Sequence, residues 1–123
     1  MQPTSLVDVK KQSQHVCDWA SRFFKDKMCF SNAVNMSEID DCDVVVGYLY
    51  SSQTNEWIEH AWNAKGDVHL DLTIDLFVSD FKYGIDKHHQ LIRLSTEQVQ
   101  SLMTNFGGIH HGALIQAGLL PSP

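Results

Sequence analysis

Residues 43–74 read DVVVGYLYSSQTNEWIEHAWNAKGDVHLDLTI and contain three strand patterns in succession. The first, residues 43–50, is rich in β-branched and aromatic residues and ends in a polar turn sequence, which is typical of a strand. Residues 56–63 and 67–74 form two further patterns, and the short AKG sequence between them favours a hairpin. This segment therefore predicts antiparallel strands at the centre of the chain.

Helical patterns flank these strands on both sides. In each of them apolar residues recur at three and four positions, which is the spacing of one buried helical face. The clearest begins at Ser95 or Thr96, where Glu97 and Gln98 supply the residues of a capping box. Helices are expected over residues 12–25, 26–36 and 96–105, with another short helix within 109–123 and a further short strand at 90–94.

Helices at both ends of a central antiparallel group place the chain in the α+β class. We expect N-terminal helices, a sheet of about three to five strands, and a C-terminal helix packed on it. With 123 residues, of which 43% are hydrophobic, the chain has the usual size of one domain with its own core. Residues 1–123 are therefore interpreted as a single domain.

Composition argues against several classes of partner. The formal net charge is −6 and the nine Lys and Arg are scattered, so nothing attracts a phosphate backbone. No apolar run approaches the roughly 18–20 residues of a membrane span, and Met1–Lys11 lacks the apolar part of a secretory signal. Three cysteines are too few for a disulfide scaffold. We expect a reduced, cytoplasmic protein that binds neither nucleic acid nor membrane.

The three cysteines have different surroundings. Cys29 follows two lysines and falls in the first turn of the second predicted helix, where free N–H groups and the helix dipole favour a thiolate. Cys42 stands between two aspartates, which oppose ionisation. Cys17 lies beside the apolar stripe of the first helix and reads as a small buried hydrophobe. Cys29 is therefore the candidate nucleophile, and a buried helical cysteine is the alternative.

A histidine and an aspartate face each other across the predicted hairpin. If the loop has two or four residues centred on Lys65 and Gly66, His60 pairs with Asp71, and their Cβ atoms lie about 4.5–5.5 Å apart. That distance suits a carboxylate that orients an imidazole. A three-residue loop with a glycine bulge would shift the register and break the pairing. Cys29 as nucleophile, His60 as base and Asp71 as the orienting group would make a catalytic triad.

Two further residues are candidates for the surroundings of this triad. Backbone N–H groups at the start of the Cys29 helix would stabilise an oxyanion, and Asn32 is a further candidate donor. Trp62 lies on the same strand face as His60, because the two are two positions apart, and is expected to wall the site.

These residues resemble the core of the transglutaminase-like and papain-like cysteine hydrolase superfamily. The resemblance covers about residues 28–73 and consists of CFSNA at 29–33, GY at 47–48, HAW at 60–62 and DLT at 71–73. In that superfamily a cysteine at a helix N-terminus faces a histidine and an aspartate on neighbouring strands, in the same chain order. The family form Asp-Pro-Thr is Asp-Leu-Thr here, and no tryptophan follows the cysteine. The resemblance implies a hydrolase, deamidase or acyl transferase that acts on peptide, protein or small amides without a cofactor.

Two other functions fit the same sequence. The chain could be a non-catalytic module that binds or inhibits a protein partner on the same scaffold. It could also bind a metal, because His60, His69 and Asp71 would lie on one face of the hairpin as a two-histidine, one-carboxylate set. The pairs at 88–89 and 110–111 point apart on any regular element and are interpreted as exposed polar histidines near loops or helix ends. No metal ligand is assigned.

Overall fold

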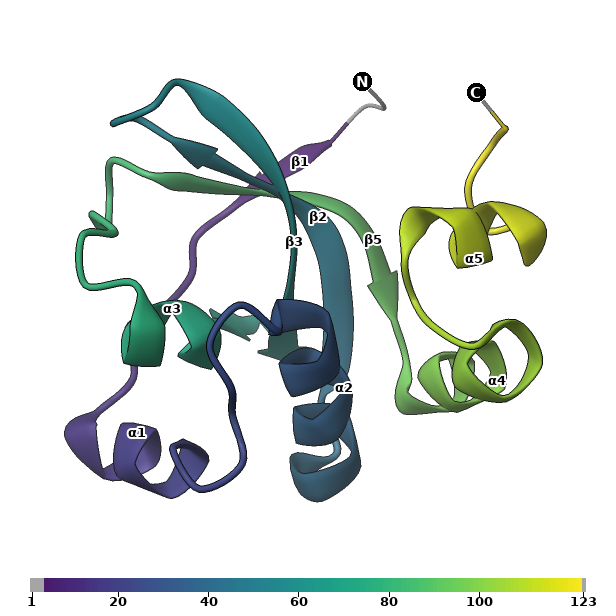
Figure 1. The fold of residues 1–123 in the computed structure, drawn as a ribbon, viewed down its shortest axis with the longest axis horizontal. Helices are drawn as coiled ribbons and strands as arrows, with labels where there is room; N and C mark the ends of the chain where they lie inside the picture. Colours follow the sequence, from purple (N-terminus) through teal and green to yellow (C-terminus); the bar gives the residue numbers. More distant parts are fainter. Residues whose placement is uncertain (1–3, 123) are drawn as a thin grey trace.

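Residues 4–122 are described by a computed structural model and form five strands and five helices (Figure 1). In chain order these are β1 (Ser5–Val7), α1 (Gln14–Ala20), α2 (Cys29–Asp40), β2 (Asp43–Ser51), β3 (Glu56–Lys65), β4 (Val68–Leu70), α3 (Leu72–Phe77), β5 (Lys87–Leu94), α4 (Thr96–Phe106) and α5 (His111–Gln116). The order of helices, antiparallel sheet and helices confirms the predicted α+β class.

The strands form one sheet in the order β1-β5-β2-β3-β4, and β2 pairs antiparallel with β3 on one side and β5 on the other. This central place explains the continuous valine run in β2, because Val44, Val45 and Val46 are all fully buried and occupy both faces of the sheet. The helices divide between the sides of the sheet: α1 and α3 lie together, and α4 and α5 lie together at the opposite side (Figure 1).

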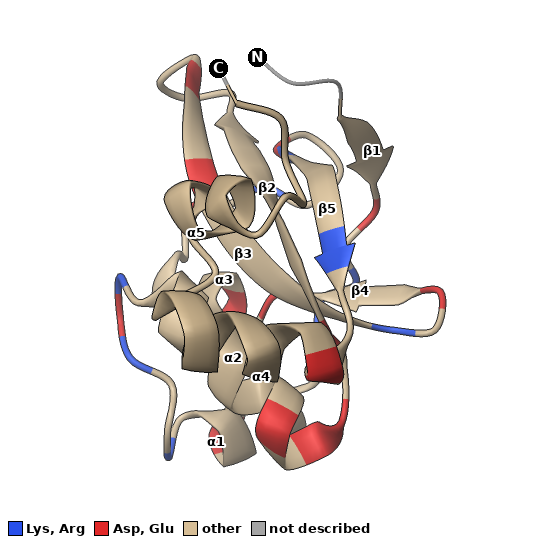
Figure 2. Cartoon of the chain, turned by 90° about the vertical axis from the view of Figure 1, so that its right-hand side faces the viewer, with Lys and Arg blue, Asp and Glu red and all other residues tan. Residues whose placement is uncertain are grey.

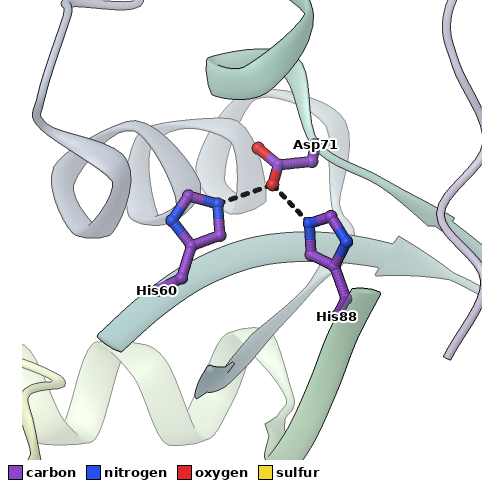
Figure 3. Close-up of side chains that lie close together, drawn as sticks. All are labelled: His60, Asp71 and His88. Atoms are coloured by element: carbon purple, nitrogen blue, oxygen red, sulfur yellow. Dashed lines mark hydrogen bonds and ion pairs between the residues drawn. The ribbon is translucent and has the colours of Figure 1, made fainter. Parts of the chain in front are cut away.

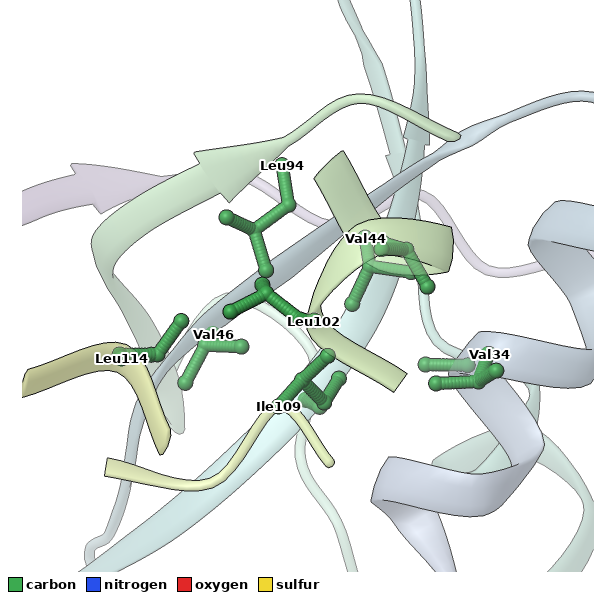
Figure 4. Close-up of a cluster of buried hydrophobic side chains, with 10 residues drawn as sticks. Val34, Val44, Val46, Leu94, Leu102, Ile109 and Leu114 are labelled. Atoms are coloured by element: carbon green, nitrogen blue, oxygen red, sulfur yellow. The ribbon is translucent and has the colours of Figure 1, made fainter. Parts of the chain in front are cut away.

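Alternation along β2 sends successive side chains into two cores. Val44 and Val46 join the larger core beneath α2, α4 and α5, where Figure 4 shows them among Val34, Leu94, Leu102, Ile109 and Leu114. Val45 points to the other face and packs with Trp62 and Ala64. The second face also carries His60, which is two residues before Trp62 on β3. The large core thus fixes the sheet, and the opposite face holds the polar residues.

Four of the helices lie where the apolar spacing predicts them, although two of these have different ends, whereas α3 occupies residues of which the first were expected to be strand. Helix α1 stops at Ala20, earlier than predicted, and α2 continues beyond the predicted end to Asp40, where Asp41 adopts a left-handed φ of 47°. The predicted capping box of α4 is confirmed. Ser95 Oγ accepts from the Gln98 N–H at 3.2 Å, and Gln98 Oε1 accepts from the Ser95 N–H at 2.9 Å.

The β3–β4 hairpin has a different register from the predicted one. Lys65 pairs with Val68, so the loop is the two residues 66–67, and Gly66 has φ +58°, as the first central residue of a type II′ turn does. β4 ends at Leu70, and the Asp71 side chain caps α3 instead of continuing the strand. The expected pairing of position 60 with position 71 is therefore wrong, because an aspartate at a helix N-cap ends the strand.

A β-bulge interrupts the pairing of β2 with β5. Val46 lies opposite Ile92, but the next residue, Gly47, lies opposite Gln90, so that Leu91 is the extra residue of β5. A Cβ atom built on Gly47 would lie 2.0 Å from the carbonyl oxygen of His89. Only glycine therefore fits at position 47.

The charged residues are spread over the molecule. Lys and Arg, blue in Figure 2, occur at separate points along the chain rather than together. Among the helices that lie within residues 4–122, none combines the length and the apolar character that a membrane crossing requires.

Candidate active site

Cys29 is the first residue of α2, which places it in the first helical turn as predicted. The preceding residue, Met28, provides no side-chain cap for the helix. The N-terminal end of the helix is instead held by hydrogen bonds of the buried Asn32 side chain. Its Oδ1 accepts from the Lys25 N–H at 3.0 Å, and its Nδ2 donates to the Lys25 carbonyl at 2.8 Å and to Thr73 Oγ1 at 3.0 Å. These bonds tie the N-terminus of α2 to α3.

The amide of Asn32 thus has protein partners for both of its hydrogens. Sequence reasoning made Asn32 a candidate oxyanion donor, but in the folded chain its contacts position the Cys29 turn. The backbone N–H groups at the start of α2 are left as the candidate donors, since an α-helix does not use its first N–H groups internally.

Three buried side chains meet on the face of the sheet opposite the large core (Figure 3). Asp71 Oδ2 accepts from His60 Nε2 at 2.6 Å and from His88 Nε2 at 2.7 Å. His60 comes from β3, His88 from β5, and Asp71 from the N-cap of α3. Their exposed fractions are 6%, 2% and 1%. Because an ionised carboxylate only accepts hydrogen bonds, both Nε2 atoms must donate.

The second carboxylate oxygen of Asp71 is also occupied. Oδ1 accepts from the Ile74 N–H at 3.2 Å and so caps α3. One side chain therefore starts a helix and joins two strands that lie on either side of β2 in the sheet. The carboxylate cannot rotate without breaking one of these three hydrogen bonds, which fixes the orientation of both imidazoles.

The charged forms of His60 and Asp71 stabilise each other. Burial alone would raise the pKa of Asp71, but the charge and hydrogen bond of His60 and the hydrogen bond of His88 hold it well below its usual range. Burial would lower the pKa of His60, but the Asp71 carboxylate raises it to about 10. His60 is therefore an imidazolium at neutral pH, paired with a buried carboxylate.

The pKa of the Cys29 thiol depends on the same imidazole. Burial would raise the pKa of Cys29, yet hydrogen bonding to His60, the positive charge of His60 and a hydrogen bond from the Ala61 backbone lower it below its ordinary value. Because Nε2 of His60 is held by Asp71, the nitrogen left for the thiol is Nδ1. Cys29 is partly exposed and stands outside the tight cluster of His60, Asp71 and His88.

Trp62 packs against both imidazoles of this cluster. Its ring lies nearly parallel to that of His60, with centroids 6.1 Å apart and 24° between the planes, and it meets His88 edge-on at 4.8 Å. Trp62 Nε1 donates to His69 Nδ1 at 3.0 Å. The tryptophan therefore lies beside His60, as its strand position predicts, and it is buried. A contact between Trp62 and substrate stays a prediction.

The second histidine that bonds to Asp71 is His88, whereas the sequence suggested His69. His69 bonds to Trp62 and is not part of the cluster, so the expected set of His60, His69 and Asp71 does not form. His88 takes that place, and its interpretation as an exposed polar residue is wrong because it is among the most buried side chains. His110 does lie at a helix end, where its Nδ1 accepts from the Ala113 N–H at 3.2 Å and caps α5.

The ligand atoms of His60, Asp71 and His88 lie within 4.8 Å of one another, which is the spacing of a possible metal site. The two nitrogen–oxygen distances are those of charge-assisted hydrogen bonds. Tetrahedral zinc, with ligands at about 2.0–2.2 Å, would hold the same atoms roughly 3.3 Å apart. A metal ion would therefore have to displace both protons and move the oxygen and nitrogen atoms apart.

Comparisons of the chain with protein families, with curated proteins and with solved structures find no match. The chemical interpretation of the site thus rests on its own geometry. A thiol whose pKa is lowered by His60, and a carboxylate that holds one nitrogen of that imidazole, are two features that a thiol nucleophile requires.

Proposed function

We propose that this protein is a small cysteine-dependent amide or acyl hydrolase, or an acyl transferase, in which Cys29 is the nucleophile, His60 the acid and base, and Asp71 the orienting carboxylate. The observation that carries the proposal is the 2.6 Å hydrogen bond from His60 Nε2 to the buried Asp71 carboxylate, which holds the imidazole that lowers the pKa of Cys29. The pKa of Cys29 is lowered by His60, and the pKa of His60 is raised by Asp71 and, to a smaller extent, by Cys29. A thiolate–imidazolium pair is the reactive form of such a nucleophile.

The proposed reaction has two halves. The Cys29 thiolate adds to a carbonyl carbon, and the C–S bond forms as the carbonyl π electrons move to oxygen. His60 gives its Nδ1 proton to the leaving amine or alcohol, the C–N or C–O bond breaks, and a thioester remains on Cys29. Water or an amine then attacks the thioester, His60 takes the proton of the attacking group, and the C–S bond breaks to restore the thiolate.

Two residues have positioning roles in this scheme. His88 shares the carboxylate oxygen of Asp71 with His60, so it opposes rotation of the carboxylate away from His60. Asn32 holds the chain before Cys29 through two hydrogen bonds to Lys25. Neither residue needs to touch substrate for its loss to slow the reaction.

The proposed assignment to the transglutaminase-like and papain-like superfamily has the same support. The chain order of the cysteine, histidine and aspartate, the helix-start position of Cys29 and the hydrogen bond from His60 to Asp71 all agree with that core. His88, the second histidine that bonds to Asp71, has no counterpart in the sequence motifs that carry the resemblance.

The test is acylation by p-nitrophenyl acetate, followed by mass spectrometry of the intact and digested protein. We expect a burst of nitrophenol and an acetyl group on Cys29, both absent from Cys29→Ala and retained in the matched variant Cys42→Ala. An unchanged burst in Cys29→Ala would refute the thiol mechanism. A folded protein with no acylation at any cysteine would favour the non-catalytic binding module.

A metal-binding protein is the second candidate, and the close approach of His60, Asp71 and His88 is the observation that favours it. Titration with Co²⁺, whose visible absorption reports tetrahedral coordination, distinguishes the two functions. The thiol proposal expects no visible band and an acylation burst that EDTA does not change. A saturable band at one equivalent, lost in His88→Ala, would support the metal instead.

A further inference from the structure

A small apolar groove lies on the sheet face that carries His60. Its volume is about 230 Å³, and it lies between the end of the β2–β3 hairpin and the segment that connects α3 to β5. The apolar part of its lining is Leu49, Ile58, Val78 and Phe81.

Register places this groove beside the catalytic group. Ile58 is two residues before His60 on β3, so both side chains lie on the same face. Leu49 is paired with Ile58 on one side and with His88 on the other. The ring of Phe81 lies 5.5 Å from that of His88. The groove therefore lies on the face that carries the proposed base, His60, and beside His88.

The walls of the groove are held in place by one buried carboxylate. Asp86 Oδ1 accepts from the N–H and the hydroxyl of Ser52, at 2.9 Å and 2.6 Å, and its Oδ2 accepts from the Lys82 N–H at 2.9 Å. These bonds fasten the α3–β5 segment to the end of β2. The groove is thus formed before any ligand arrives, which lowers the entropy cost of binding.

The size and charge of the groove limit what it can hold. A whole drug-sized ligand needs a pocket of about 300–1,000 Å³, so a groove of about 230 Å³ suits a single side chain or a short acyl chain. Glu56 and Asp80 also line it. Their carboxylates disfavour an acidic group at the same place.

A larger cavity of about 820 Å³ lies elsewhere, between α1, the C-terminal part of α2 and the β3–β4 turn. Met36 lines it, seven residues after Cys29, which is roughly 10 Å along the helix axis. Its lining includes none of the residues of the proposed site. The lining of the groove also leaves out Cys29 and His60, but it includes Phe81, whose ring packs beside His88, so the groove is the better candidate for the group next to the reacting carbonyl.

We infer that the groove lined by Leu49, Ile58, Val78 and Phe81 is the specificity pocket of the enzyme and takes an apolar, non-acidic side chain or short acyl chain next to the carbonyl that Cys29 attacks. This inference rests on the proposed function, because it needs Cys29 and His60 to be the reacting groups.

A series of N-alkylmaleimides, from methyl to hexyl, tests the groove without a known substrate. The second-order rate of addition is measured for each cysteine by mass spectrometry. At Cys29 we expect the rate to rise with chain length, by up to roughly four-fold for each CH₂ group that becomes buried, and to level off when the groove is full. At the buried Cys42 the rate should be slow and should not rise with chain length.

The matched variants are Ile58→Asp and Val68→Asp. The two original side chains are equally exposed, at 46% and 45%, but Val68 is on β4 and does not line the groove. Ile58→Asp should remove the dependence of the Cys29 rate on chain length, whereas Val68→Asp should keep it. Ile58→Ala should reduce the dependence of the Cys29 rate on chain length. This uncharged variant keeps the test valid if Ile58→Asp does not fold, and circular dichroism checks the fold of each variant.

The outcomes separate the two proposals. A fast Cys29 whose rate does not depend on chain length overturns the groove and leaves the thiol mechanism standing. A Cys29 that reacts with methylmaleimide no faster than Cys42 overturns the thiol mechanism itself. A chain-length dependence that survives Ile58→Asp assigns the apolar contact to another surface and also overturns the inference.

Discussion

Helix α2 has a cysteine at each end, and the two thiols have opposite properties. Cys29 is the first residue of the helix, and its pKa is lowered. Cys42 follows the last residue, Asp40, by two positions, and burial together with the charge of Asp40 raises its pKa to about 11. Burial is the largest influence on both thiols and acts in the same direction. The difference comes from what each sulfur meets: an imidazolium in one case and carboxylates in the other.

The two ends also differ in the way the backbone contributes. Free N–H groups and the positive end of the helix dipole lie at Cys29, while free carbonyls and the negative end lie near Cys42. Cys42 is 2% exposed and packs in a core with Met36, Leu70 and Leu72. It behaves as a small apolar side chain. A buried thiol is thus unreactive by default, and the proposed reactivity of Cys29 depends on His60 and its carboxylate partner.

The largest effect is expected from removal of the His60 imidazole, which should abolish the difference in thiol pKa between Cys29 and Cys42. In His60→Ala, burial still raises the pKa of Cys29, but the imidazole that lowers it is gone. The thiol pKa should therefore rise above its ordinary value. Alkylation of Cys29 by iodoacetamide at pH 7 should slow by roughly 10- to 100-fold, since each pKa unit changes the thiolate fraction about tenfold. Rates at each cysteine, measured by mass spectrometry against pH, report the change. An unaltered Cys29 rate, with Cys42 as internal control, would contradict it.

Substitution of the carboxylate acts on the fold as well as on the thiol. Asp71→Asn keeps the shape but leaves His60 and His88 without a charged acceptor, so Cys29 should become more like Cys42. Loss of one member of a buried pair typically costs about 3–5 kcal/mol. Urea denaturation should show a loss of that order, with a slower Cys29 reaction in the folded protein. Stability equal to wild type would mean that the pair contributes little.

The same pair predicts how stability depends on pH. The pKa of His60 is raised to about 10, so its contribution is complete below the unfolded value of about 6.5 and is lost as the pH rises towards 10. The pKa of Asp71 is depressed, so its contribution is present above about 4 and is lost as the pH falls further. The free energy of unfolding should therefore decrease on both sides of a plateau near pH 4–6.5. The curve for His60→Gln should lack the decrease above pH 6.5.

Loss of the second histidine should have an intermediate effect. His88→Gln keeps a donor of similar reach but a looser hold on Asp71, so His60 stays in place less strictly. We expect a two- to ten-fold lower acylation rate and a small upward shift in the apparent pKa of Cys29, because positioning contributes modest factors. The pH profile of alkylation separates this from simple destabilisation, which would change the rate without moving the profile.

The smallest effect is expected at the other end of the helix. Asp40→Asn removes the first carboxylate that raises the pKa of Cys42, but burial is the larger cause. The pKa of Cys42 should fall and still stay above 9.0, its ordinary value, and Cys42 should remain slow to alkylate in the folded state. Cys29 should be unaffected. A Cys42 as reactive as Cys29 would show that charge, rather than burial, keeps it neutral.

Much of the fold follows from local sequence. The valine run predicts a buried central strand, and the Ser95–Gln98 capping box sets the start of α4. Strand β1, with three mostly exposed residues, offers no such signal and was not predicted. The sequence predicts that α2 starts at residue 26, whereas the helix begins at Cys29, after Met28, which provides no side-chain cap. Segments with strong periodicity or a cap are thus predictable, and short edge strands held only by their neighbours are not.

The site was predictable only in part. His60 and Asp71 do meet, but through the N-cap of α3 rather than through the expected cross-strand pair. His88 could not be placed, because regular alternation puts it on the same face as Ile92 and Leu94, in the large core. The bulge reverses the faces along β5, and nothing in residues 87–94 themselves reveals it. Side-chain placement in a sheet depends on register, which a single strand sequence does not encode.

That bulge determines which of two neighbouring histidines joins the buried cluster. Beyond it, His88 lies opposite Leu49 and reaches Asp71, whereas His89 lies opposite Tyr48 on the other face. In a regular ladder that kept Leu91, this residue would pair with Gly47, and His89 instead of His88 would lie opposite Leu49. One extra residue of β5, outside the site itself, therefore determines which of the two imidazoles belongs to the buried cluster.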